Sequence, residues 1–256
     1  MYAKELWIVV VDGGPGSTEI TAKSAQGLFE KYATESRVGT QRVVWKKISA
    51  GGDVTEVNRW EKLEATPSNA QTTATGALIE IGLYVVAHGQ EESGQIAGGG
   101  PYSLITKLTA ASVPRAQKVS FVACYSGRHD KEAAFDDRLR DYDPTIHGLP
   151  VEELSFISMF AVGYQDAYSS KGPLHVAGWE SFVSVYHPDK TEDVPHNAKA
   201  RDVGRKYVAA AGSNPYTFMK SGSSSRKTKK RMFRWAFVEG QARVEKIGLP
   251  EWKNST

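Results

Sequence analysis

Two short apolar runs, IGLYVVAHG (residues 81–89) and KVSFVACYSG (residues 118–127), decide the fold of this chain. Each begins with a stretch of the length of a buried strand, rich in β-branched and aromatic residues. The first stretch ends in His88-Gly89, and the second ends at Cys124, with Gly127 close behind. If the two are neighbouring parallel strands, His88 and Cys124 lie at one edge of one sheet, which is where sites form in open α/β sheets.

Cys124 and His88 are residue types that act together in nucleophilic catalysis. A thiol becomes a useful nucleophile when a base or an imidazolium lies beside it, and histidine is the usual partner. Taken singly, a cysteine in this position is more often a small buried hydrophobic residue, and a histidine more often makes a structural hydrogen bond. Together, each at the carboxyl end of a buried strand and near a glycine, they indicate a cysteine hydrolase.

The motifs AHG (residues 87–89) and ACYSG (residues 123–127) resemble those of the caspase, metacaspase, legumain, clostripain, gingipain and RTX-toxin clan of cysteine peptidases. The second motif looks most like the corresponding segments of legumains and metacaspases. The resemblance extends over residues 5–165 by the order of elements. It implies a caspase-like three-layer α/β sandwich and leaves the family within the clan unassigned.

The resemblance also implies a mechanism. Cys124 would attack a peptide carbonyl to form a thioester, and His88 would protonate the leaving amine and then activate water. The backbone N–H groups of Gly89 and Cys124 would stabilise the tetrahedral oxygen. We interpret Ser126 as the cap of a following helix, whose dipole favours the thiolate. No cofactor is required, and the expected partner is a protein or peptide substrate.

Two further residues are candidates for substrate binding. Val122 shares a strand face with Cys124, because side chains two positions apart point the same way. Where legumains and metacaspases carry an acidic residue, Val122 supplies neither charge nor hydrogen bond, which favours an apolar or small side chain before the cleaved bond. Asp12, at the end of the first strand, would restore a basic preference if it reaches the cleft, and is otherwise a turn residue before Gly13.

Composition is that of a globular enzyme. The chain has 256 residues, 40% hydrophobic and 24% charged, with a net charge of +3, enough for one large α/β domain. One cysteine excludes an internal disulfide, and no apolar run reaches the ~20 residues that span a bilayer. Asp12 follows the N-terminal apolar run where a signal peptide would be cleaved, so we expect a cytoplasmic protein, or one exported without a cleavable signal.

The N-terminal half alternates strands and helices. Strands are predicted over residues 6–11 and 42–48, the second near the sheet edge, with a helix between them to about Tyr32 and a short helix near residues 54–63. Pro101 opens a helix to about Thr109, since proline is tolerated in a first turn. This order predicts a mainly parallel sheet with helices on both faces.

The C-terminal half is less regular. A helix is predicted near residues 151–160 and a strand over 161–164. Beyond them lie short β-like runs at 174–177, 181–186 and 234–239, the last forming a hairpin with 243–247. We therefore divide the chain into a catalytic core, residues 1–170, and a β-rich part, residues 171–256, that packs on the same domain.

Other kinds of site are disfavoured. The loop at residues 13–18 resembles a phosphate loop but lacks its lysine, and Pro15 removes one backbone donor. No Gly-x-Ser-x-Gly pentapeptide of serine hydrolases occurs. No metal site is expected, because five histidines have no metal-ligand spacing: His129, His147, His175, His187 and His196.

A basic segment near the C-terminus is the remaining candidate site. Six basic residues occur within nine positions: Arg226, Lys227, Lys229, Lys230, Arg231 and Arg234. Such clusters attract phosphate-rich ligands, although a solvated loop explains them equally well. RTX-type relatives are activated by inositol hexakisphosphate, so the resemblance allows a polyanion activator. The modest net charge disfavours nucleic acid as a partner.

Three functions remain open on this sequence: an active cysteine endopeptidase, a peptidase-like binding protein without activity, and a non-peptidase cysteine hydrolase or acyltransferase. The charged loop at residues 128–150 is a candidate self-cleavage site, because several clan members are cut there. A bacterial effector, a toxin-processing enzyme and a housekeeping protease are all compatible with the sequence.

Overall fold

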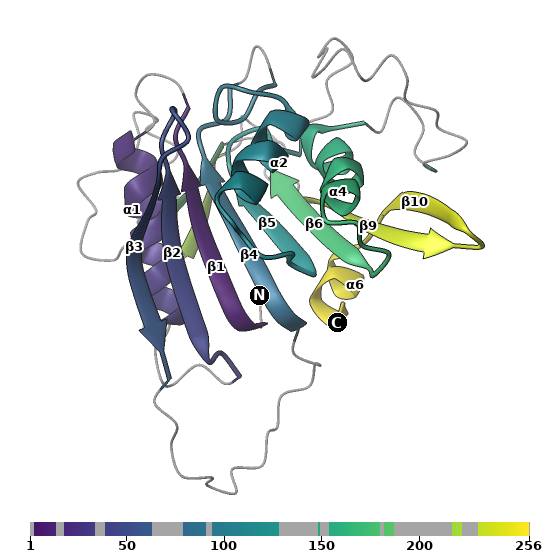
Figure 1. The fold of residues 1–256 in the computed structure, drawn as a ribbon, viewed down its shortest axis with the longest axis horizontal. Coiled ribbons are helices and arrows are strands. Elements are labelled where there is room, and N and C mark those ends of the chain that lie inside the picture. Colours follow the sequence, from purple (N-terminus) through teal and green to yellow (C-terminus); the bar gives the residue numbers. More distant parts are fainter. Residues whose placement is uncertain are drawn as a thin grey trace, which may run out of the picture.

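One eight-stranded sheet organises the molecule (Figure 1). The computed structural model describes residues 3–13, 18–33, 39–62, 79–90, 94–127, 148, 154–179, 182–186, 217–221 and 230–255. The strand order is β10-β9-β6-β5-β4-β1-β2-β3. The strands are β1 (Ala3–Val11), β2 (Arg42–Ile48), β3 (Val54–Glu61), β4 (Ile79–Ala87), β5 (Lys118–Val122), β6 (Leu174–Trp179), β9 (Lys230–Val238) and β10 (Gln241–Lys246).

The centre of this sheet is parallel and its two edges are antiparallel. Strands β2, β1, β4, β5 and β6 run in the same direction. At one edge β3 pairs antiparallel with β2, and at the other the β9–β10 hairpin pairs antiparallel with β6. A separate antiparallel pair is formed by β7 (Phe182–Tyr186) and β8 (Thr217–Ser221). The mainly parallel sheet predicted from the sequence is confirmed.

Helices cover both faces of the sheet (Figure 1). Helix α1 (Thr18–Tyr32) lies behind it, and α2 (Pro101–Ala110) and α4 (Phe156–Ala167) lie in front. The last helix, α6 (Leu249–Asn254), packs its Trp252 with Ala177 of β6 and Met232 of β9. This is the three-layer α/β arrangement expected of a caspase-like fold.

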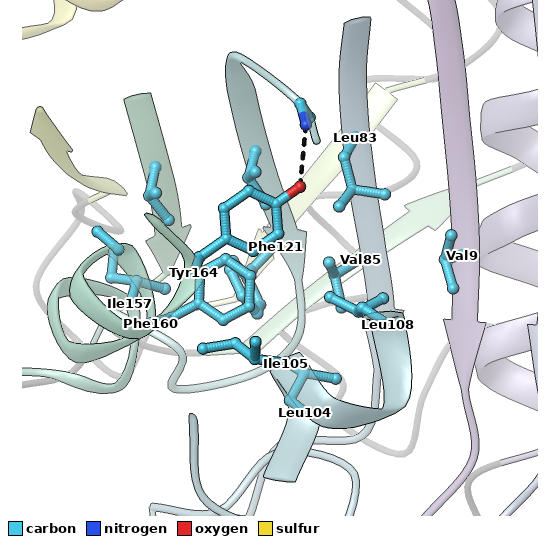
Figure 2. Close-up of a cluster of buried hydrophobic side chains, with 14 of the residues drawn as sticks. Val9, Leu83, Val85, Leu104, Ile105, Leu108, Phe121, Ile157, Phe160 and Tyr164 are labelled. Carbon is cyan, nitrogen blue, oxygen red and sulfur yellow. Dashed lines mark hydrogen bonds between the residues drawn. The ribbon is translucent and has the colours of Figure 1, made fainter. Parts of the chain in front are cut away.

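The larger core lies between the sheet and helices α2 and α4 (Figure 2). Phe121 of β5 makes an edge-to-face contact with Phe160 of α4, at 4.9 Å between ring centroids. Tyr164, one turn further along α4, accepts a hydrogen bond at 2.9 Å from the backbone N–H of Ala116, drawn in Figure 2. Helix α4 is therefore anchored to the segment that leads into β5, the strand before Cys124.

Two local predictions were wrong. Residues 54–61 form strand β3 rather than a short helix; nearly all of its side chains are exposed, so no burial pattern marked it as a strand. Residues 161–164, predicted as a strand after a helix at 151–160, lie inside α4. A short apolar run fits a buried strand and a helix buried on all sides equally well. Helix α4 is of the second kind, because ten of its consecutive residues, from Phe156 to Gln165, are buried.

The chain beyond residue 170, which we expected to be β-rich and to pack on the same domain, contributes strands to the central sheet. Strands β6, β9 and β10 all lie beyond residue 170 and complete the sheet that β1, β4 and β5 begin. The described residues of the C-terminal part are thus integrated into the same sheet. The predicted hairpin is confirmed as β9–β10, and the basic residues Lys230, Arg231 and Arg234 belong to strand β9 rather than to a solvated loop.

Candidate functional site

The strand register brings His88 and Cys124 level with each other. Strands β4 and β5 are parallel neighbours, and their last paired residues are Val86 and Val122. Two positions beyond that pair, His88 after β4 lies opposite Cys124 after β5. Both residues therefore follow their strands at the same edge of the sheet, as the sequence predicted.

Gly89 shows how closely the two chain segments approach. A Cβ atom at Gly89 would lie 1.8 Å from the carbonyl oxygen of Cys124 and 3.2 Å from its backbone nitrogen. Glycine is therefore required here for contact between the two turns. His88 is exposed and Cys124 is partly buried, so this contact leaves both side chains access to solvent.

The turn that carries Cys124 is attached to the next strand, β6. Ser126 is completely buried; its Oγ donates to the carbonyl of Ala123 at 2.9 Å and accepts from the backbone N–H of Trp179 at 3.0 Å. The N–H of Gly127 donates to the carbonyl of Trp179 at 2.8 Å. The Ser126 hydroxyl therefore attaches the turn that carries Cys124 to β6, whereas its predicted role as the cap of a following helix stays a prediction. Residues 128–147, with the predicted helix and most of the self-cleavage loop, lie outside the described ranges.

A second loop, residues 96–99, supports His88 from the other side. The N–H of Ala97 donates to the carbonyl of His88 at 2.9 Å, and Ile96 forms a β-bridge with Gly89. A Cβ at Gly13 would lie 1.9 Å from the carbonyl oxygen of Ala97. The backbone around His88 is thus held by main-chain contacts with residues 96–99. The approach of Gly13 to that loop requires a residue without a Cβ atom.

The two candidate substrate-binding residues are both buried. Val122 is 3% exposed and packs in the core cluster beneath α1, beside Val86 and Trp179. Asp12 is 8% exposed and forms an ion pair with Lys47, at 2.9 Å between Oδ2 and Nζ. Val122 therefore contributes to the core, and a substrate-binding role for either residue stays a prediction.

The described part of the basic segment is divided between the two faces of β9. Lys230 and Arg234 are an even number of positions apart and share a face, whereas Arg231 lies on the other. Arg234 forms ion pairs with Glu245 and Glu251, and Lys230 Nζ lies 4.8 Å from the Trp252 ring. Arg226, Lys227 and Lys229 lie outside the described residues, so polyanion binding stays a prediction.

A row of three basic side chains, two of them buried, was missed by the sequence analysis. Lys118, His175 and Arg234 are paired across β5, β6 and β9, and Lys118 and His175 are 5% and 7% exposed. Burial lowers the pKa of Lys118 to about 8. Burial, together with Lys118 and Arg234, lowers the pKa of His175 to about 4. Only strand register brings these three residues together, and no local sequence pattern indicates it.

Two kinds of feature are absent from the described ranges. No group of three or more His, Cys, Asp or Glu side chains there lies close enough to hold a metal ion. No helix among the described residues has the length and apolar character needed to cross a bilayer.

Comparison with known proteins gave a distant structural similarity. No protein-family model and no curated protein matches the chain. An X-ray structure of an inactive zymogen C11 protease from Parabacteroides distasonis is similar over 70% of this chain and 49% of its own, at 10% identity and a TM-score of 0.28. The chain spans about half the length of that protease. A similarity of this size supports no assignment of function, so any functional conclusion depends on the strand ends themselves.

Proposed function

We propose that this chain is a cysteine endopeptidase that hydrolyses peptide bonds through a Cys124/His88 dyad. The observation that supports it best is the contact between Gly89 and the Cys124 backbone, which holds the two strand ends together. A partly exposed cysteine and an exposed histidine at neighbouring parallel strand ends suit nucleophilic catalysis by cysteine.

The proposed reaction proceeds in two steps. In the first, the Cys124 sulfur attacks the peptide carbonyl carbon, the C–N bond breaks, and His88 gives a proton to the leaving amine. In the second, His88 takes a proton from water, which attacks the thioester and releases the carboxylate and the thiol. The N–H groups of Gly89 and Cys124 are the proposed donors to the tetrahedral oxygen.

The dyad is tested by cleavage of a peptide library by wild type, Cys124→Ala and His88→Ala. We expect either substitution to reduce turnover by about 10²-fold or more, because a positioned acid–base typically contributes about 10²–10⁴-fold. The matched control is His175→Gln, which removes an imidazole from the first half of β6 and should keep wild-type turnover per folded molecule. More than about a tenth of wild-type turnover in His88→Ala would rule the dyad out.

The same variants separate the alternative functions. A thiol-reactive peptide probe that labels wild type but not Cys124→Ala excludes an inactive binding protein. Comparing amide with ester substrates then separates a peptidase from another cysteine hydrolase or an acyltransferase. Hydrolysis of esters alone would favour the latter two.

A further inference from the structure

Asp12 follows β1 as directly as His88 follows β4. Its backbone N–H donates to the carbonyl of Ile48 at 2.9 Å, which continues the β1–β2 ladder by one residue. Side chains alternate along a strand, so Asp12 lies on the same face as Val10, whose side chain packs beneath α1. Lys47 lies on that face too, and its ion pair with Asp12 agrees with this placement.

One oxygen of the Asp12 carboxylate has no hydrogen-bond partner among the described residues. Oδ2 contacts Lys47, whereas Oδ1 is buried and accepts no hydrogen bond from them. A buried carboxylate oxygen without a donor is costly, and most buried polar atoms in folded proteins have a partner. The position of Oδ1 is therefore suited to accept a hydrogen bond from a donor that this conformation does not supply.

His88 is the donor that the register places beside it. The last paired residues of β1 and β4 are Val11 and Ala87, so Asp12 and His88 are level one position later. By alternation His88 falls on the face of Val86, which packs in the same cluster as Val10. Neighbouring strands lie about 4.8 Å apart, within reach of a carboxylate and an imidazole.

The order of the three strands places His88 between Asp12 and Cys124. Strand β4 lies between β1 and β5, so His88 has Asp12 on one side and Cys124 on the other. A base between a nucleophile and a carboxylate is the arrangement in which the carboxylate fixes the orientation and tautomer of an imidazole.

We propose that Asp12 is a positioning residue whose Oδ1 accepts a hydrogen bond from the His88 imidazole and holds its other nitrogen toward Cys124. This proposal rests on the Cys124/His88 dyad. Lys47 fixes the remaining carboxylate oxygen and so orients Oδ1. Asp12 would act only through His88 and would not contact the substrate.

The first test does not depend on turnover. We would measure the tautomer of His88 by ¹⁵N NMR in Cys124→Ala and in the double variant that also carries Asp12→Asn. We expect one dominant tautomer in the first protein and a mixed population in the second, because the hydrogen bond to one ring nitrogen decides where the proton resides. Identical tautomer populations in the two proteins would overturn the proposal.

The second test compares kinetics for peptides with arginine and with leucine before the cleaved bond. For Asp12→Asn we expect kcat to fall about 10- to 100-fold on both peptides with KM unchanged, and Asp12→Glu to recover part of the loss. Asp53→Asn, which removes an exposed carboxylate from the β2–β3 turn, should leave both constants unchanged. A rise in KM confined to the arginine peptide would overturn positioning and assign Asp12 to substrate binding.

Failure of this inference can be distinguished from failure of the proposed function. If Cys124→Ala and His88→Ala kept wild-type turnover, the dyad would be wrong whatever Asp12 does. If those variants were inactive while Asp12→Asn showed wild-type kinetics and an unchanged His88 tautomer, only the role of Asp12 would be wrong.

Discussion

At the scale of single residues, the backbone of the candidate site depends on glycines, because residues without a Cβ atom let two chain segments come into contact. Gly89 and Gly13 allow main chain to approach main chain more closely than any Cβ would permit. Such positions tolerate no substitution without displacement of a neighbouring segment. At Gly89 the neighbouring segment is the one that carries Cys124, the proposed nucleophile.

We therefore expect Gly89→Ala to impair both stability and catalysis. The added methyl would lie 1.8 Å from the Cys124 carbonyl oxygen, and forcing such contacts costs about 1–3 kcal/mol of unfolding free energy. Turnover should fall further than the folded fraction does, because the turns that hold Cys124 and His88 must separate. Urea denaturation and peptide cleavage measure the two effects.

Gly51→Ala is the matched control. A Cβ at Gly51 would have no neighbour nearer than 3.7 Å, and we expect the free energy of unfolding to change by less than about 0.5 kcal/mol. If Gly89→Ala behaved like Gly51→Ala, the two turns would not be in contact in solution, and the main support for the dyad would be lost.

At the scale of elements, strand pairing gives residues properties that their own segments do not predict. His175 is in a short strand with nothing unusual beside it in sequence, yet β5 and β9 place Lys118 on one side and Arg234 on the other. Burial and these two cations keep its imidazole neutral by lowering its pKa. A histidine in this environment disfavours the folded state in acid.

The pH dependence of stability tests whether His175 is neutral between Lys118 and Arg234. The pKa of His175 is about 4 in the folded protein against 6.5 for the ordinary group, so the unfolded chain binds a proton first as the pH falls. The stability linked to neutral His175 is complete above pH 6.5 and is lost as the pH falls toward 4. The free energy of unfolding, measured in urea at about pH 7 and pH 4.5, should therefore fall about 2 kcal/mol less in His175→Gln than in wild type.

Equal pH dependence in the two proteins would mean that His175 is protonated in the folded state, contrary to its burial between two cations. The absolute stability of His175→Gln does not enter the comparison, because only the difference between the two pH values is used. Other titrating groups are shared by both proteins and cancel.

At the scale of the whole molecule, helix α6 covers basic side chains of the sheet. Trp252 is 7% exposed and packs with Ala177, Met232 and Ile247. Lys118 donates to its carbonyl oxygen, and the Lys118 amine lies 4.6 Å from its ring. The C-terminal helix thus joins β5, the strand that leads to Cys124, to the β9–β10 end of the sheet.

We expect Trp252→Ala to lower the free energy of unfolding by about 3 kcal/mol, as removal of a buried tryptophan ring typically does. Trp252→Phe keeps an aromatic ring over the lysines and should cost about half as much. Urea denaturation measures both. Wild-type stability in Trp252→Ala would show that α6 is not packed on the sheet in solution.

The sequence by itself determined the elements whose signal is local. A buried parallel strand is a short, continuous apolar run, so β1, β4 and β5 could be recognised, and with them the residues that follow: Asp12, His88 and Cys124. Pro101 marked α2 in the same way. The placement of Cys124 and His88 at one edge of the sheet also followed, since carboxyl ends of parallel strands meet there.

Only the tertiary structure decided what depends on contacts between distant segments. Strand β3 carries exposed residues and exists because β2 offers its edge, and α4 is a helix because its apolar residues are buried on every side. The hydroxyl of Ser126 joins two strands, Gly89 contacts the Cys124 backbone, and Asp12 keeps one buried oxygen unbonded among the described residues. Strand register and close packing bring these groups together, and neither can be predicted from the spacing of residues along the chain.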